Sequence, residues 1–207
     1  MIKFVVFICG AIVMSFEILG SRVLAPNFGS SVFVWGSLIS VFLAGLSAGY
    51  YLGGRLADIN PSSRKLSLII IAPGLLLLIF PLYSAPVSDW IFMQDLGVRM
   101  SPLSASSALF LIPSVFLGIV SPYTAKLMIC SLHTSGKTIG MLYALSTFGS
   151  IIGTLITSFY LIALAGVNAL IMGQGVLLIA LAIPLYFMNL SCSMEQISPI
   201  EARGVTK

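Results

Sequence analysis

Six long apolar runs, separated by short polar segments, dominate the pattern of hydrophobic and polar positions along this chain of 207 residues. A bilayer core about 30 Å thick needs roughly 20 apolar residues in a helix, and each run approaches or exceeds that length. The pattern predicts an all-α integral membrane protein: a six-helix bundle in a transmembrane domain of residues 1–190, with residues 191–207 as a short cytoplasmic tail. The expected spans are 4–24, 32–53, 66–84, 103–123, 139–163 and 167–190.

The first run also resembles a secretory signal, because Lys3 precedes the apolar stretch 4–14 and residues 23–25 (VLA) form a possible cleavage site. Two features favour a retained span. The run extends well beyond the apolar core of a signal, and Pro26 would directly follow the cut.

The segment 85–102 contains Trp90 among acidic and basic residues. We expect it to lie along the outer membrane interface as an amphipathic turn or short helix, with a plain loop as the alternative.

Composition excludes a water-soluble globule, because 58% of the residues are hydrophobic and only 8% are charged, against roughly a quarter in soluble domains. The net charge of +4 does not indicate nucleic-acid binding, since the ten Lys and Arg residues are scattered between apolar runs and form no patch. The lipid bilayer is therefore the expected surrounding.

The Lys and Arg residues show a bias between the two sides of the membrane. With the N-terminus inside, Arg22 and Arg99 fall outside and eight residues fall inside. The inside set is Lys3, Arg55, Arg64, Lys65, Lys126, Lys137, Arg203 and Lys207. Cytoplasmic loops carry the excess of positive charge, so both termini are predicted to be cytoplasmic.

Small residues are concentrated in the second and fifth spans. Gly45 and Gly49, and likewise Gly149 and Gly153, lie one helical turn apart, which allows close helix packing. The two pairs are separated by a constant offset of 104 residues. Since the second and fifth spans run in opposite directions, this offset suggests two inverted three-helix repeats, half of a major-facilitator-like fold, with coincidence as the alternative.

Glu17 is the acidic residue that lies within a span, where a carboxylate usually faces the bundle interior or a water-filled cavity. It is a candidate for binding a cation or accepting a proton, with Arg22 near the outer end of the same span. The structural alternative is that Glu17 is neutralised by Arg22 or hydrogen-bonded by hydroxyls such as Ser15, Ser40 or Ser47.

The sequence GGRLAD at 53–58 closes the second span on the inner side. It resembles the inner-loop signature of major facilitator transporters, in which Gly, Asp and Arg hold helices together. Arg55 and Asp58 are therefore candidates for an inner-loop latch, and a simple charged helix end is the alternative.

Catalytic chemistry has no support in the sequence. The segment 135–138 (SGKT) imitates a phosphate loop, but Ser131 replaces the required glycine and no strand precedes it. His133 is the one histidine, and the three cysteines follow no metal spacing. We predict no enzyme activity, no metal, no cofactor and no nucleic-acid partner.

Several longer stretches together resemble the membrane region of the bacterial fused spermidine-synthase-like proteins, which are described as major-facilitator-like. The resemblance covers nearly all of residues 5–165. The stretches are FEILGSR at 16–22, LAP at 24–26, FLAGLSAGYYLGGRLAD at 42–58, GIVSP at 118–122 and YALSTFGSIIGT at 143–154.

In that family a cytosolic spermidine-synthase-like domain follows the membrane helices, whereas this chain stops at Lys207. The resemblance implies a bacterial inner-membrane anchor or transport-type unit for a small cationic amine, acting with a separate cytosolic synthase-like partner. Six spans equal half of a major facilitator, so a homo-oligomer is expected. The alternative is a non-transporting interaction subunit of a larger membrane complex, which the scarcity of charge within the spans favours.

Overall fold

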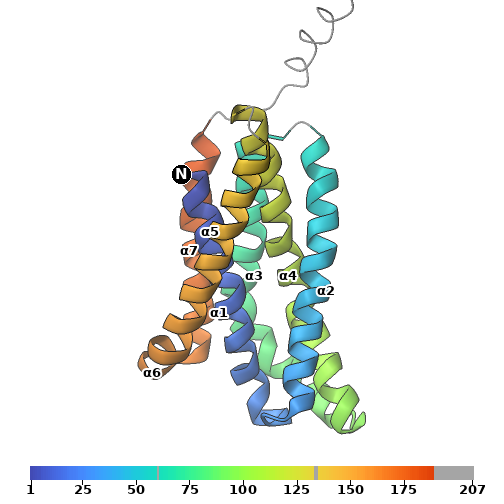
Figure 1. Ribbon diagram of the computed structural model, residues 1–207. Helices are drawn as coiled ribbons and strands as arrows, with labels where there is room; N and C mark the ends of the chain where they lie inside the picture. The colour runs from blue at the N-terminus through green and yellow to red at the C-terminus, as the bar shows by residue number, and fades with distance from the viewer. Residues whose placement is uncertain (60, 133–134, 189–207) are drawn as a thin grey trace, which may run out of the picture.

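The structure, a computed structural model that describes residues 1–59, 61–132 and 135–188, is all α-helical and has six helices long and apolar enough to cross a membrane (Figure 1). The predicted tail at 191–207 and His133 lie outside the described residues. The elements are α1 (Ile2–Phe28), α2 (Val32–Asp58), α3 (Ser63–Met93), α4 (Gly97–Leu132), α5 (Ser135–Ile156), the π-helix η1 (Thr157–Leu161), α6 (Ile162–Leu164) and α7 (Val167–Phe187). The fifth span combines α5, η1 and α6.

The segment 85–102 is neither a loop nor a separate interfacial helix. α3 continues to Met93 and α4 begins at Gly97, so only a short turn connects them. Two residues with positive φ, Asp95 at 43° and Gly97 at 84°, reverse the chain there. The two helices extend beyond the apolar runs into this polar segment. They can do so because a helix satisfies its own backbone hydrogen bonds whether or not lipid surrounds it.

α1 lies at the centre of the bundle and contacts α2, α3, α4, α5 and α7. The most extensive contacts join α2 with α4, α3 with α7, and α1 with α5 (Figure 1). Four phenylalanines from the first four helices, Phe16, Phe42, Phe80 and Phe110, form a buried aromatic cluster. The ring of Phe16 lies 5.2–5.5 Å from the other three.

Glycines allow α2 to lie directly against the backbone of α4. A side chain at Gly45 would come within 3.1 Å of the Leu111 carbonyl, and one at Gly49 would overlap the Val115 carbonyl. Such contacts are possible only for residues without a Cβ, and they explain why α2 and α4 share the longest interface.

The same contact recurs between α5 and α1. A side chain at Gly149 would overlap the Phe7 carbonyl, and one at Gly153 would overlap the Ala11 carbonyl. Each glycine lies 104 residues after its counterpart in α2, and each carbonyl lies 104 residues before its counterpart in α4. The glycines and the carbonyl groups next to them are therefore both related by an offset of 104 residues, which the sequence shows for the glycines.

α3 and α7, the third spans of the two three-helix units, contact each other directly. A Cβ at Gly74 of α3 would lie 3.2 Å from the Gly175 carbonyl, and one at Gly175 of α7 would lie 2.7 Å from the Gly74 carbonyl. The reciprocal contact is the one expected where a two-fold axis passes between two equivalent helices. The offset here is 101 residues.

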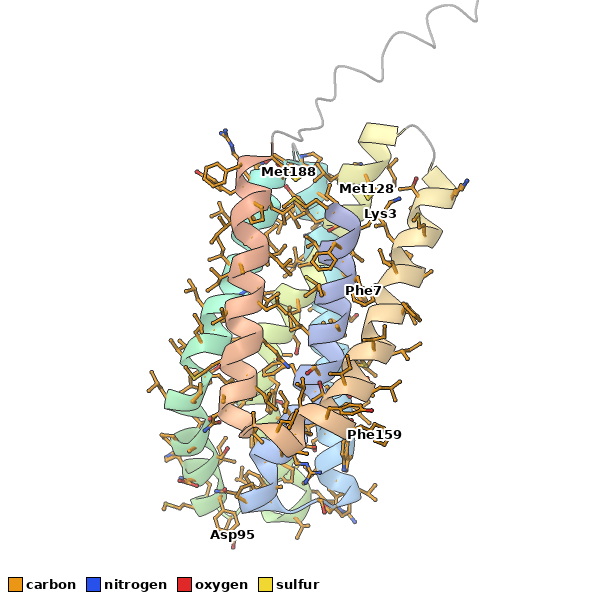
Figure 2. The ribbon with its side chains drawn as sticks, turned by 90° about the vertical axis from the view of Figure 1, so that its left-hand side faces the viewer. Lys3, Phe7, Asp95, Met128, Phe159 and Met188 are labelled. Atoms are coloured by element: carbon orange, nitrogen blue, oxygen red, sulfur yellow. The ribbon has the colours of Figure 1, made fainter. Side chains whose placement is uncertain are left out.

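The helix directions agree with inverted topology. α1, α2 and α3 run down, up and down in the view of Figure 1, whereas α4, α5 and α7 run up, down and up. Lys3, Met128 and Met188 lie at one end of the bundle and Asp95 at the other (Figure 2). The described residues thus form two three-helix units of opposite orientation, packed by equivalent contacts.

Candidate functional site

Glu17 lies on one face of α1 together with Val13 and Met14, which are one turn away on the helix surface. The side chain is half-buried. Among residues 1–59, 61–132 and 135–188, no ion pair or hydrogen bond to its carboxylate is found. Ser40 and Ser47 are exposed on α2, and Ser15 is bonded elsewhere. The hydroxyl partners considered from the sequence are therefore not used.

Val13 and Met14 line a cavity of about 230 Å³, which we call the front cavity. Its walls come from α1, α2, α4 and α5. Six polar side chains line it: Tyr50, Ser121, Tyr143, Ser146, Thr147 and Ser150. Ser121 is the counterpart of Glu17 in the second unit, 104 residues later, so the front cavity lies where equivalent faces of α1 and α4 meet. The cavity therefore offers several hydroxyl groups between the helices.

Arg22 does not pair with Glu17 in the part of the chain that the structure describes. Five residues correspond to about 140° of rotation around a helix, so the two side chains leave α1 in different directions. Arg22 lines a different pocket of about 450 Å³, where the Asn27 amide nitrogen donates to the Asp89 carboxylate at 2.7 Å. Glu17 and Arg22 therefore lie at separate locations.

The candidate latch residues also have separate contacts. Asp58 forms an ion pair with Lys126 of α4, with 2.8 Å between Oδ1 and Nζ, and thereby connects the C-terminal parts of α2 and α4. Arg55 stacks on the ring of Tyr51, 4.5 Å from its centroid. Both members of the ion pair are substantially exposed, so it contributes about 0–1 kcal/mol to stability.

Gly45, Gly49, Gly149 and Gly153 pack helices within the chain, as described above. They are buried in the α2–α4 and α5–α1 contacts and are not presented to a second copy. The sequence predicts helix packing by these residues.

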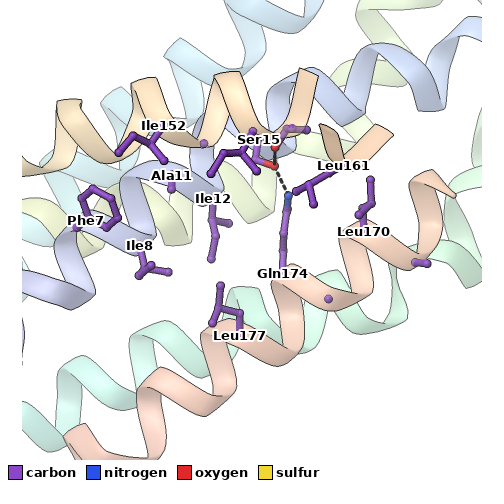
Figure 3. A pocket seen from close by; sticks show the side chains of 15 residues that line it. Phe7, Ile8, Ala11, Ile12, Ser15, Ile152, Leu161, Leu170, Gln174 and Leu177 are labelled. Carbon is purple, nitrogen blue, oxygen red and sulfur yellow. Dashed lines mark hydrogen bonds between the residues drawn. The ribbon is translucent and has the colours of Figure 1, made fainter. Parts of the chain in front are cut away.

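A second site, the lateral groove, lies over α1 between α5–η1 and α7 and has a volume of about 400 Å³ (Figure 3). Its lining is apolar except for Ser15, Thr157 and Gln174. The Ser15 and Thr157 hydroxyls are 2.6 Å apart, and the Gln174 amide nitrogen donates to Ser15 Oγ at 2.6 Å. Figure 3 shows Gln174 reaching from α7 to Ser15 on α1. Together these three side chains form a polar cluster inside the bundle.

Sequence reasoning did not identify this polar cluster. A glutamine within an apolar span is itself a signal, because a buried amide in a membrane needs partners from other helices. Ser15 and Thr157 give no such signal, since hydroxyl residues are common in spans and no pattern predicts a π-helix at Thr157–Leu161. π-helical turns within α-helices occur frequently at functional sites.

No group of three or more His, Cys, Asp or Glu side chains that could hold a metal ion occurs among the described residues. The two sites offer hydrogen-bonding groups and apolar surface.

The chain is an integral membrane protein with six candidate spans. No protein-family model matches it, and neither a curated protein nor a solved structure does. Its fold is that of an all-α, six-helix membrane bundle.

Proposed function

We propose that the chain is one half of a transport-type unit for a small cationic amine, with the front cavity as part of the path. The observation that carries this proposal is Glu17, a half-buried carboxylate without an ion-pair partner among the described residues. A carboxylate within a span is energetically costly, and such residues usually belong to substrate or ion pathways.

The geometry supports a path shared between two copies. The front cavity is only partly enclosed by a single bundle, and its polar side chains come from α2, α4 and α5. A second six-helix copy placed against this face would enclose the cavity. The inverted repeat supports the same function, because transporter folds place their sites at the interface of such repeats. The step from fold to transport is an analogy.

The cationic amine and a cytosolic synthase-like partner follow from the sequence resemblance alone. Glu17 supplies the negative charge that an ammonium group requires. The end of the bundle that carries Lys3 and Lys126 is proposed to face the cytoplasm of a bacterial cell, where such a partner would bind.

Uptake of radiolabelled spermidine by proteoliposomes containing the full chain tests the proposal. We expect Glu17→Gln to reduce initial uptake at least tenfold, because removal of the counter-charge leaves the amine uncompensated in a low-dielectric site. Asp89→Asn, at the outer end of α3, is the matched control and should retain uptake. Absence of flux from the unaltered chain under every imposed gradient, or equal flux with Glu17→Gln, would contradict transport of this substrate through Glu17.

The proposed orientation predicts the accessibility of two exposed positions. In a chain whose three cysteines are replaced by alanine, Asp95→Cys should react with a membrane-impermeant maleimide in intact cells. Ile59→Cys, at the opposite end, should react only after permeabilisation. The reverse pattern would show that both termini face outward.

An interaction subunit of a larger membrane complex is the second candidate. It is favoured by the scarcity of charge, since Glu17 is the acidic residue near the middle of a span. Purification in mild detergent at native expression levels separates the possibilities. Recovery of the chain without other proteins would argue against both this candidate and the synthase-like partner.

A further inference from the structure

The lateral groove breaks the equivalence of the two units. At the offsets found for the packing contacts, its polar residues Ser15, Thr157 and Gln174 correspond to Ile119, Gly53 and Pro73. All three counterparts lack a polar side chain. The repeat therefore accounts for the scaffold but does not account for the polar cluster, which occurs on one side only.

The difference between Gly53 and Thr157 distinguishes the groove from the equivalent place between α2 and α4. At Gly53 a Cβ would lie 2.7 Å from the Ile119 carbonyl, so α2 continues directly against α4. Thr157 has a side chain at the equivalent place, and the π-helix begins there. α5 and α7 both pack on α1 but barely contact one another in the described part of the chain, which leaves the groove between them (Figure 2).

Gln174 carries a hydrogen-bonding group without a partner. The side chain is only 9% exposed, and while its amide nitrogen donates to Ser15, its Oε1 is buried and bonded to no described group. An unpaired buried carbonyl oxygen is destabilising because it has lost its hydrogen bonds to water. A ligand that donates a hydrogen bond at this point would remove that cost.

The location restricts the class of ligand. Ser15 lies midway along α1, so the polar cluster is near the middle of the membrane. None of the described residues that line the groove is charged. A charged lipid headgroup would find no counter-ion there, whereas a neutral molecule dissolved among the acyl chains could enter sideways past exposed residues such as Ile156 and Leu177.

We propose that the lateral groove binds an uncharged, lipid-soluble molecule with a hydroxyl group on an apolar chain. The hydroxyl donates to Gln174 Oε1, which a rotation about the last side-chain torsion turns toward the groove. That rotation releases the bond from the Gln174 amide nitrogen to Ser15, and Ser15 keeps its hydrogen bond with Thr157. The apolar chain lies along Ile8, Ile12 and Leu177. A cavity of about 400 Å³ is within the range of small-molecule sites. This site is separate from the front cavity and does not depend on transport.

Photolabelling of the full chain in lipid nanodiscs tests the proposal. The probe is dodecan-1-ol with a diazirine in its chain, and the comparison is the same diazirine-bearing chain without the hydroxyl. We expect the alcohol to label residues of α1, α5 and α7 that line the groove, with saturation and with competition by unlabelled dodecan-1-ol. The hydrocarbon should label lipid-exposed positions without saturation.

Two variants with matched controls locate the binding. A Cβ at Gly173, which lines the groove, meets no atom within 4 Å, so Gly173→Leu should fill the groove without disturbing the fold and abolish saturable labelling. Gly140→Leu, equally unobstructed but outside the groove, should leave labelling unchanged. Gln174→Leu should weaken alcohol binding roughly tenfold, whereas Gln94→Leu in the α3–α4 turn should not.

Size-exclusion chromatography identifies variants that fail to fold. If Gln174→Leu fails to fold, Gly173→Leu still tests the site. Equal labelling of the groove by alcohol and hydrocarbon would reduce the site to an acyl-chain contact and overturn the proposal. Saturable labelling that survives Gly173→Leu would also overturn it.

Discussion

Gly49→Leu is expected to prevent accumulation of the folded protein. A Cβ at this position overlaps the Val115 carbonyl and lies 2.8 Å from Gly118 Cα, and both obstacles are backbone atoms of α4. They cannot turn aside as a flexible side chain would. Separating the two helices removes contacts along their whole shared length, so the cost should be about 3 kcal/mol or more.

Fluorescence-detected size-exclusion chromatography of a tagged chain measures this effect. The folded peak should fall at least tenfold for Gly49→Leu. Gly36→Leu on the same helix is the control, because a Cβ there meets nothing within 4 Å, and it should retain the peak. A normal peak from Gly49→Leu would mean that α2 does not pack on α4 as described.

Phe16→Ala is expected to have the second largest effect. The ring is 0% exposed and contacts three other phenylalanines from α2, α3 and α4. Lipid is as apolar as the core, so the loss comes from the void and the missing dispersion contacts. Large-to-small changes of this kind cost about 3–5 kcal/mol in soluble proteins.

Thermal unfolding in detergent, followed by loss of the monodisperse peak, measures the change. Phe16→Ala should lower the midpoint by several degrees, and Phe16→Leu should lower it less because more of the volume remains. Phe4→Ala is the control, since Phe4 is on the same helix and 57% exposed. Similar midpoints for Phe16→Ala and Phe4→Ala would contradict the aromatic core.

The six spans could be predicted from the sequence because the membrane imposes a length and an apolar composition on every crossing helix. The repeat could be predicted because close helix contacts need glycine, and glycines at fixed offsets leave a visible pattern. The ends of the helices could not be predicted in the same way. α3 and α4 continue through residues 85–93 and 97–102, where helix formation is not imposed by lipid and the hydropathy pattern gives no boundary.

The sequence does not show which residues from distant segments contact one another. Asp58 was identified as an inner-loop residue, but Lys126, which pairs with it, is one of several basic residues near the same side of the membrane. The partners of Gly49 and Gly153 are carbonyl groups, which every residue has. Glu17 was identified because an acid within a span is rare, whereas its relation to the front cavity depends on the rotation of α1 in the bundle.

The two sites differ in their relation to the repeat. The front cavity is lined by equivalent faces of both units, and Glu17 lies one turn along α1 from its lining residues Val13 and Met14. The lateral groove lies between α1 of the first unit and α5, η1 and α7 of the second, and its polar side chains correspond to residues without polar side chains. Functional sites are expected where a chain departs from its repeated scaffold, because the scaffold itself does not require the departure.

The most direct test of two inverted, equivalently packed units is to compare four glycine-to-leucine variants in one assay of folded protein. Gly49 and Gly153 are equivalent close-packed positions, and Gly36 and Gly140 are equivalent open ones. We predict that Gly49→Leu and Gly153→Leu both lose the folded peak, and that Gly36→Leu and Gly140→Leu both retain it. A tolerated Gly153→Leu beside a disrupted Gly49→Leu would contradict the equivalence of the two units.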